Sequence, residues 1–176
     1  DFTVIGAIDV PASGAPVSVG DQLQITGRGL GADEEISISL GGVHLSLAPV
    51  GGEPGAFSPT TATGGFHATV VIPVLSKGLR TLRVTGTTSG ATADTFVITI
   101  PKVVSVGPLM GSIGTEVLIE GTGFAANGAI SVDLGSQTNV AIGSASADGS
   151  VNFTFIVNQS PPINGQTLTI RIGSDT

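Results

Sequence analysis

Residues 22–42 read QLQITGRGLGADEEISISLGG, and residues 116–136 read EVLIEGTGFAANGAISVDLGS. The two stretches align without a gap at an offset of 94 residues, and they are identical at 8 of 21 positions. Similarity of a chain to itself at a fixed period indicates a duplicated structural unit. The chain of 176 residues is therefore predicted to hold two copies of one unit.

Apolar and polar residues alternate over short stretches in and around the repeat. A period of two is typical of strands that bury one face, and Gly, Pro, Asn and Asp separate the stretches as turn residues do. No stretch of ten or more residues has helical spacing. The sequence predicts an all-β fold, a sandwich or a barrel. The clearest alternations are Leu23 and Ile25, Ile36 to Leu40, Phe96 to Ile100, Ile130 to Leu134, and Val151 to Val157.

The composition excludes several classes of protein. A net charge of −7 argues against a partner that is a nucleic acid or an anionic membrane surface, because both require a basic face. The absence of cysteine excludes disulfides and thiolate metal sites, and no apolar run has the length of a membrane span. The chain begins at Asp1, so we expect a removed leader or an excised piece, and a secreted, cell-surface protein.

The start of the second copy resembles a known family. Residues 101–108 read PKVVSVGP, Gly111 follows, and residues 114–124 read GTEVLIEGTGF. This pattern resembles the opening of IPT/TIG domains, which are immunoglobulin-like sandwiches. The resemblance implies two tandem immunoglobulin-like domains, in which the Gly-x-Gly-Phe segment ends an early strand. The first copy departs from the pattern with Leu30 in place of Phe124, and it lacks a proline at the place of Pro108.

The ends of the chain differ from the interior of the repeat. The first copy closes with the strand-like residues 94–100, whereas no such stretch follows residues 167–172 in the second copy. At the offset of 94, Phe2 aligns with Phe96 and Val4 with Ile98. We therefore expect three parts: a donor strand at residues 1–9, a first domain at 10–100, and a second domain at 101–176 without its last strand.

A sandwich without its last strand exposes core residues and an unpaired edge, which is a template for another chain. We expect Phe2, Val4, Gly6 and Ile8 of one copy to fill a groove at Leu168, Ile170 and Ile172 of another, as in donor-strand complementation. Each large apolar side chain would contribute about 1.5–3 kcal/mol before ordering costs. A head-to-tail contact that does not close into a ring makes a filament, pilus-like or sheath-like.

Two alternatives remain open at this point. The chain is a repeat segment of a large surface adhesin or an accessory module of a secreted enzyme, or residues 1–8 fold back within their own chain. A polymer needs residues 1–8 for assembly. A module of a tandem array needs covalent neighbours instead.

No catalytic or cofactor site is predicted. His44 and His67 stand in strand-like stretches without clustered partners, and no nucleophile-elbow motif is present. The acidic run Asp33-Glu34-Glu35 is predicted to be a solvated turn rather than a calcium site, which needs six or more oxygen ligands.

Two Asn-x-Ser/Thr sequons begin at Asn152 and Asn158. Both asparagines fall on the polar side of the alternation from Val151 to Val157, as a glycan would require. They are candidate glycosylation sites, and the alternative is a pair of ordinary polar surface residues.

Overall fold

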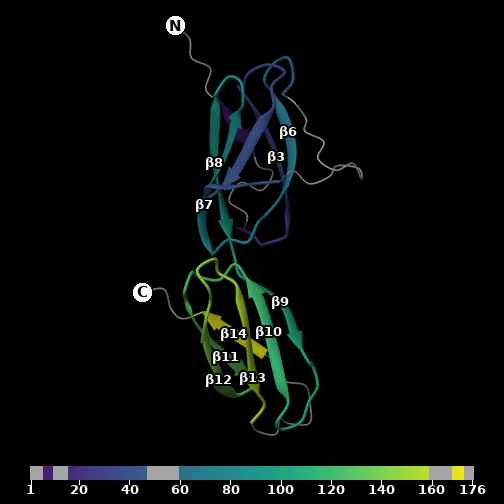
Figure 1. Cartoon of the computed structure of the whole chain (residues 1–176), viewed down its shortest axis with the longest axis vertical. Helices are drawn as coiled ribbons and strands as arrows, with labels where there is room; N and C mark the ends of the chain where they lie inside the picture. Colours follow the sequence, from purple (N-terminus) through teal and green to yellow (C-terminus); the bar gives the residue numbers. More distant parts are fainter. Residues whose placement is uncertain (1–5, 10–15, 47–59, 159–167, 173–176) are drawn as a thin grey trace. The chain divides into compact units, whose positions relative to one another are not determined.

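The computed structural model describes residues 6–9, 16–46, 60–158 and 168–172, and it confirms the all-β prediction (Figure 1). It divides into two compact units, unit 1 with residues 1–73 and 79–99, and unit 2 with residues 74–78 and 100–176. The strands are β1 (Ala7–Asp9), β2 (Pro16–Val17), β3 (Gln22–Arg28), β4 (Ile36–Leu40), β5 (Val43–His44), β6 (Phe66–Val71), β7 (Gly78–Gly86), β8 (Thr92–Thr99), β9 (Lys102–Gly107), β10 (Glu116–Thr122), β11 (Ala129–Leu134), β12 (Gln137–Ser144), β13 (Val151–Ile156) and β14 (Leu168–Ile172).

Unit 1 contains two sheets, with strand orders β1-β3-β6 and β2-β8-β7-β4-β5. Neighbouring strands are antiparallel in every pair with a recorded register except β2 and β8, which are parallel. Alternate residues of both sheets are buried, as the period-two pattern predicts. The fully buried side chains include Ile25 of β3, Leu40 of β4, Val70 of β6, and Leu82 and Val84 of β7.

Unit 2 repeats this plan with the sheets β13-β10-β9 and β12-β11-β14. Its core is formed by both sheets, because buried residues of β10, β11 and β13 contact one another and Leu168 and Ile170 of β14 pack against them. The buried residues are Val117, Ile119, Phe124, Ile130, Val132, Ala145, Val151, Phe155 and Val157.

The two copies share individual backbone hydrogen bonds as well as sequence. Gly20 N donates to Ile72 O at 2.9 Å, and its counterpart Gly114 N donates to Val157 O at 2.8 Å. The first pair is nine residues further apart along the chain than the second. The additional residues fall between β4 and β6, where the sequence has an extra Gly/Pro-rich stretch.

The residue after the Gly-x-Gly turn is held in the same way in both units. Leu30 N donates to Gly64 O at 3.2 Å, and Phe124 N donates to Gly149 O at 3.0 Å. Gly64 and Gly149 have φ angles of 71° and 81°, and a Cβ atom on either would overlap the carbonyl oxygen of Leu30 or Phe124. Glycine is therefore required at both positions by conformation and by space.

The outward face of β8 corrects an expectation from the sequence. The alternation of Phe96, Ile98 and Ile100 was interpreted as a continuation of the core pattern. In the structure Phe96 is 55% exposed and Ile98 is 37% exposed, while Val97 and Thr99 are buried. The period of two was predicted correctly, but the buried face was wrong, since Ala93, Val97 and Thr99 lie on the buried face.

Gly149→Ala should destabilise unit 2 by more than about 1 kcal/mol, because the new methyl group meets Phe124 O in a backbone conformation that alanine avoids. Urea unfolding of the full chain measures the loss. The control is Gly114→Ala, which has a φ of 90° but open space around the Cβ position, and should cost less. Equal losses for both variants would contradict the close-contact explanation.

Candidate functional site

Strand β8 lies between β7 and β2 and completes the larger sheet of unit 1. Its start is fixed by the turn from β7, in which Gly86 N donates to Ala91 O at 2.9 Å. Its end pairs in parallel with β2, where Pro16 lies opposite Ile98. Strand β8 therefore closes unit 1 by pairing on both of its edges.

Strand β14 is the counterpart of the second half of β7. Leu168 lies opposite Leu134 and Ile172 opposite Ile130, as Leu82 lies opposite Leu40 and Gly86 opposite Ile36. Within the residues that the structure describes, unit 2 has no counterpart of β8, and β14 is the last strand of its sheet. One edge of β14 is therefore without a neighbouring strand in the described part of unit 2.

This open edge leaves part of the core exposed. Leu82 and Val84 of β7 are both 0% exposed, whereas their counterparts Leu168 and Ile170 are only partly buried against the unit 2 core. The side chain of Ile172 lies outside the described residues, although its backbone pairs with β11. We define the acceptor edge as β14 with the side chains of Leu168 and Ile170.

The residues predicted for the donor strand divide into two groups. Phe2 and Val4 lie outside the described residues. Ile8 belongs to β1 and lies opposite Gly27 of the same chain, and a Cβ atom on Gly6 would be 2.8 Å from Thr92 O. In this structure Gly6 and Ile8 thus lie in unit 1 of their own chain.

Strand β1 is also the counterpart of the beginning of β9. Ala7 lies opposite Arg28 on β3, and Lys102 lies opposite Thr122 on β10. Residues 1–5 therefore correspond in the chain to residues 96–100, at an offset of 95 instead of 94. In this register Phe2 matches the buried Val97.

The acidic run contains a structural carboxylate that sequence reasoning missed. Glu34 was predicted to lie in a solvated turn, which is wrong because its side chain is only 5% exposed. Oε1 accepts from Gly31 N at 2.5 Å and from Ser89 Oγ at 2.6 Å. Oε2 accepts from Ser89 N at 2.7 Å and from Thr88 N at 2.9 Å.

These donors hold the pKa of Glu34 at about 2, below its ordinary value of 4.5. The hydroxyl and N–H of Ser89 are the largest causes, and burial opposes them. Because Ser89 follows β7 and precedes β8, Glu34 anchors the turn that starts the closing strand. One signal in the sequence could have found it: Glu34 is in phase with the alternation of Ile36 to Leu40, whereas its exposed neighbours Asp33 and Glu35 are out of phase.

Unit 2 does not repeat this anchor. In unit 1 the Glu34 carboxylate lies against Gly86, and a Cβ atom at that position would overlap it. The counterparts in unit 2 are Gly128 and Ile172. Unit 2 thus lacks the carboxylate that holds the turn between the last two strands of unit 1.

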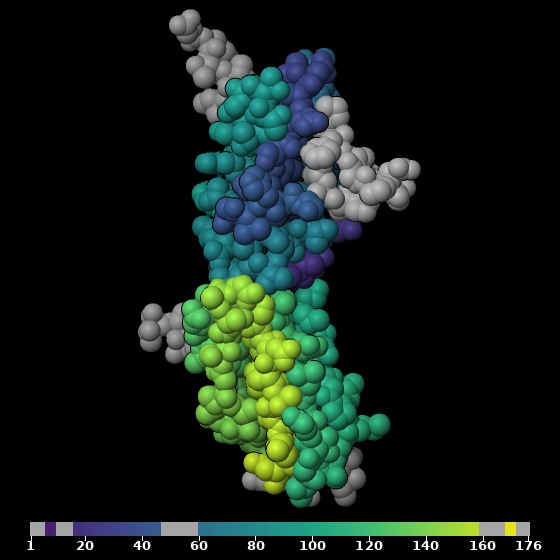
Figure 2. Space-filling model, in the orientation of Figure 1, coloured from purple at the N-terminus to yellow at the C-terminus, as the bar shows by residue number. Residues whose placement is uncertain are grey.

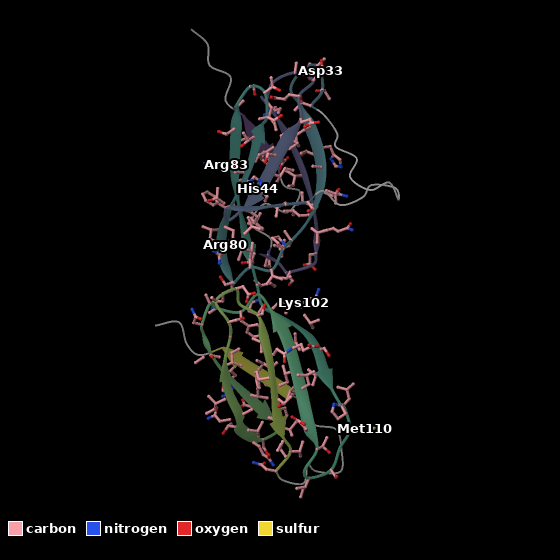
Figure 3. The ribbon with its side chains drawn as sticks, viewed as in Figure 1. Asp33, His44, Arg80, Arg83, Lys102 and Met110 are labelled. Atoms are coloured by element: carbon pink, nitrogen blue, oxygen red, sulfur yellow. The ribbon has the colours of Figure 1, made fainter. Side chains whose placement is uncertain are left out.

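Cross-strand ion pairs join β7 to β8 in unit 1 and β11 to β14 in unit 2. Arg83 of β7 contacts Asp94 of β8 through two hydrogen bonds of 2.8 and 2.7 Å (Figure 3 labels Arg83). These bonds lower the pKa of Asp94. In unit 2, Arg171 of β14 pairs with the buried Asp133 of β11 at 2.5 Å, so β14 is attached to its sheet on the closed side.

Both sequon asparagines lie at exposed positions in unit 2. Asn152 is on β13, whose surface is the yellow-green column in Figure 2, and Asn158 follows that strand. Val151, Phe155 and Val157 of the same alternation are buried, so the alternation predicted from the sequence is confirmed here. Glycosylation itself stays a prediction.

His44 and His67 are both exposed, on β5 and β6 of different sheets. His44 Nδ1 is 3.3 Å from Ser37 Oγ. No group of three His, Cys, Asp or Glu residues suited to a metal occurs among the described residues. The same part of the chain contains no helix that is long and apolar enough to cross a membrane.

Comparison with known proteins agrees with the geometry of the second copy. Residues 101–176 match the family model of the IPT/TIG domain. The match begins at the PKVVSVGP segment and includes the acceptor edge on β14. No curated protein is significantly similar to the chain.

Several solved structures are distantly similar to the chain. They include the Yersinia pseudotuberculosis adhesin InvE, with 14% identity and a TM-score of 0.41 over 97% of this chain and 56% of that chain. The ICAM-5 D1–D4 ectodomain fragment has 13% identity and a TM-score of 0.36, over 95% and 45%. The plexin A4 extracellular region has 17% identity and a TM-score of 0.38, over 95% and 17%. The chain spans about half or less of these proteins, and similarity at this level bears on neither partners nor activity.

Glu34→Gln should lower the melting temperature at pH 7, because an amide nitrogen then faces backbone and hydroxyl donors. The pKa of Glu34 is lower in the folded state, so its stabilisation is present above the ordinary value of 4.5 and disappears as the pH falls through about 2. The difference from the wild type should therefore narrow from pH 5 to pH 2. Thermal unfolding followed by circular dichroism measures it.

Glu35→Gln is the matched control, since Glu35 is the exposed neighbour on the same segment. Its melting temperature should follow the wild type across this range. A pH-independent difference for Glu34→Gln would show that the carboxylate charge has no role in the turn.

Proposed function

We propose that this chain is a structural, non-catalytic subunit of an extracellular filament, pilus-like or sheath-like. Subunits join head to tail when the N-terminal residues of one copy cover the acceptor edge of unit 2 in another. The filament lies at the cell surface, and its partners are further copies of the chain, with surface glycans at Asn152 and Asn158.

The difference between β7 and β14 is the observation that carries this proposal. The same core positions are completely buried in unit 1, at Leu82 and Val84, and only partly buried in unit 2, at Leu168 and Ile170. Exposed apolar residues beside an unpaired strand edge favour the addition of a strand. The added strand would restore a sheet that the first copy displays in full.

The N-terminal residues have the pattern that the acceptor edge requires. In the register given by β1 and β9, Phe2 and Val4 take the places of Val97 and Thr99, which are both buried in unit 1. Ile8 is already paired within its own unit, so we limit the proposed donor to residues 1–5. The donor strand would then lead directly into β1, as β8 leads into β9.

A covalent tandem array is the second candidate function. The observation that favours it is the short connection between β8, which ends at Thr99, and β9, which begins at Lys102. If the chain belongs to a longer protein of such repeats, the strand that covers β14 comes from a following segment. This is the module of a surface adhesin or secreted enzyme considered above.

Phe2→Asp should abolish assembly of the full chain, because a carboxylate would enter an apolar core position. Thr3→Asp is the matched control. Thr3 corresponds to the exposed Ile98, so this variant should assemble as the wild type does. Light scattering and electron microscopy of the three proteins at equal concentration provide the measurement.

A second form of the chain separates polymer from array. With residues 1–8 repeated after Thr176, the acceptor edge can be covered within one molecule, and the protein should stay monomeric. Polymers of this form as abundant as those of the wild type would refute the acceptor assignment. A wild type that remains monomeric at high concentration would favour the array.

A further inference from the structure

The segment between β9 and β10 contains the two most exposed large apolar residues of the described chain, together with a third exposed one. Leu109 is 85% exposed, Met110 is 89% exposed and Ile113 is 58% exposed. Figure 3 labels Met110 on this segment. Sequence reasoning assigned no role to it, although three large apolar residues within five positions of a turn are an informative signal.

The counterpart of this segment in unit 1 is β2. Asp21 N donates to Ser18 O at 3.1 Å, and Thr115 N donates to Ser112 O at 3.0 Å, so Ser18 and Ser112 are equivalent positions. Pro16 and Val17 of β2 therefore correspond to Met110 and Gly111. In unit 1 these residues pair in parallel with the end of β8.

The apolar exposure follows from the same open position as the acceptor edge. Val17 and Val19 of unit 1 are half-buried where β8 is in place. In unit 2, where the described residues contain no such strand, Ile113 at the place of Val19 is mostly exposed. By analogy with unit 1, the open position next to β14 is bordered on its other edge by the segment that corresponds to β2.

We infer that Met110–Gly111 is the second wall of the acceptor site and pairs in parallel with the N-terminal strand of another copy. This inference rests on the proposed function and adds residues and a register to it. Since Pro16 lies opposite Ile98, and Ile98 corresponds to residue 3, Thr3 of the donor lies opposite Met110. Val4 then lies opposite Gly111 and faces the core.

The segment around Met110 and the N-terminal segment are both uncharged, so they are compatible with each other as paired strands. Residues 107–114 carry no charged side chain, and residues 2–8 carry none either. Met110 takes the place of a proline in β2, so the pairing at this position needs no N–H donor from the acceptor. The contact is made by the main chain and by apolar side chains, as in strand addition.

Disulfide trapping tests the register, because the chain has no cysteine of its own. The full chain is made as three single-cysteine variants, Met110→Cys, Thr3→Cys and Val4→Cys. Paired strands lie close enough for a disulfide, and a shift by one residue turns the side chain to the other face. Met110→Cys mixed with Thr3→Cys should give severalfold more mixed dimer under mild oxidation than Met110→Cys mixed with Val4→Cys.

The outcomes separate this inference from the proposed function. Filaments of the wild type together with the expected preference for Thr3→Cys support both. Filaments without that preference overturn the second wall and leave strand donation standing. Chains that neither assemble nor cross-link overturn both.

A charge variant gives an independent readout. Ile113→Lys should weaken assembly severalfold without lowering the melting temperature of the unassembled chain, since the residue is exposed there. Ile142→Lys is the matched control, because Ile142 is 75% exposed on β12, at the opposite edge of the sheet from β14. Equal effects of the two variants would overturn the role of Ile113.

Discussion

The pairing of one strand on both of its edges is the constraint on which the rest of this structure depends. In unit 1 that strand is β8, which contacts β7 on one edge and β2 on the other. Leu82 and Val84 of the adjacent β7 are completely buried. The two copies share equivalent strands and several backbone hydrogen bonds, whereas this position beside β14 holds no strand among the described residues of unit 2.

Glu34 shows how the filled position is stabilised locally. Its carboxylate accepts four hydrogen bonds, three of them from the turn between β7 and β8. The counterpart pair in unit 2, Gly128 and Ile172, provides no such acceptor. In the first copy a carboxylate thus stabilises the turn that leads into its last strand. The second copy has no carboxylate at the equivalent position.

The duplicated unit and the all-β fold could be predicted, because they depend on the repeat and on the period of two. The buried face of β8 and the hydrogen-bond donors of Glu34 could not, because they depend on individual tertiary contacts. The offset of 94 residues identified the duplicated unit, and its fold was expected from the alternation and the IPT/TIG resemblance. The face of β8 was wrong because Phe96 and Ile98 are apolar yet point outward. The buried state of Glu34 depends on donors 54 and 55 residues away, Thr88 and Ser89, which no local pattern reveals.

The edge of β14 is the feature of unit 2 on which strand addition depends. Hydrogen exchange of the amides of β14, compared with those of the second half of β7, measures that edge directly in dilute and in concentrated protein. We predict that β14 exchanges faster than β7 in dilute protein, and that its exchange slows on assembly while that of β7 does not change. Equal protection of the two strands in dilute, monomeric protein would contradict the claim that unit 2 is open.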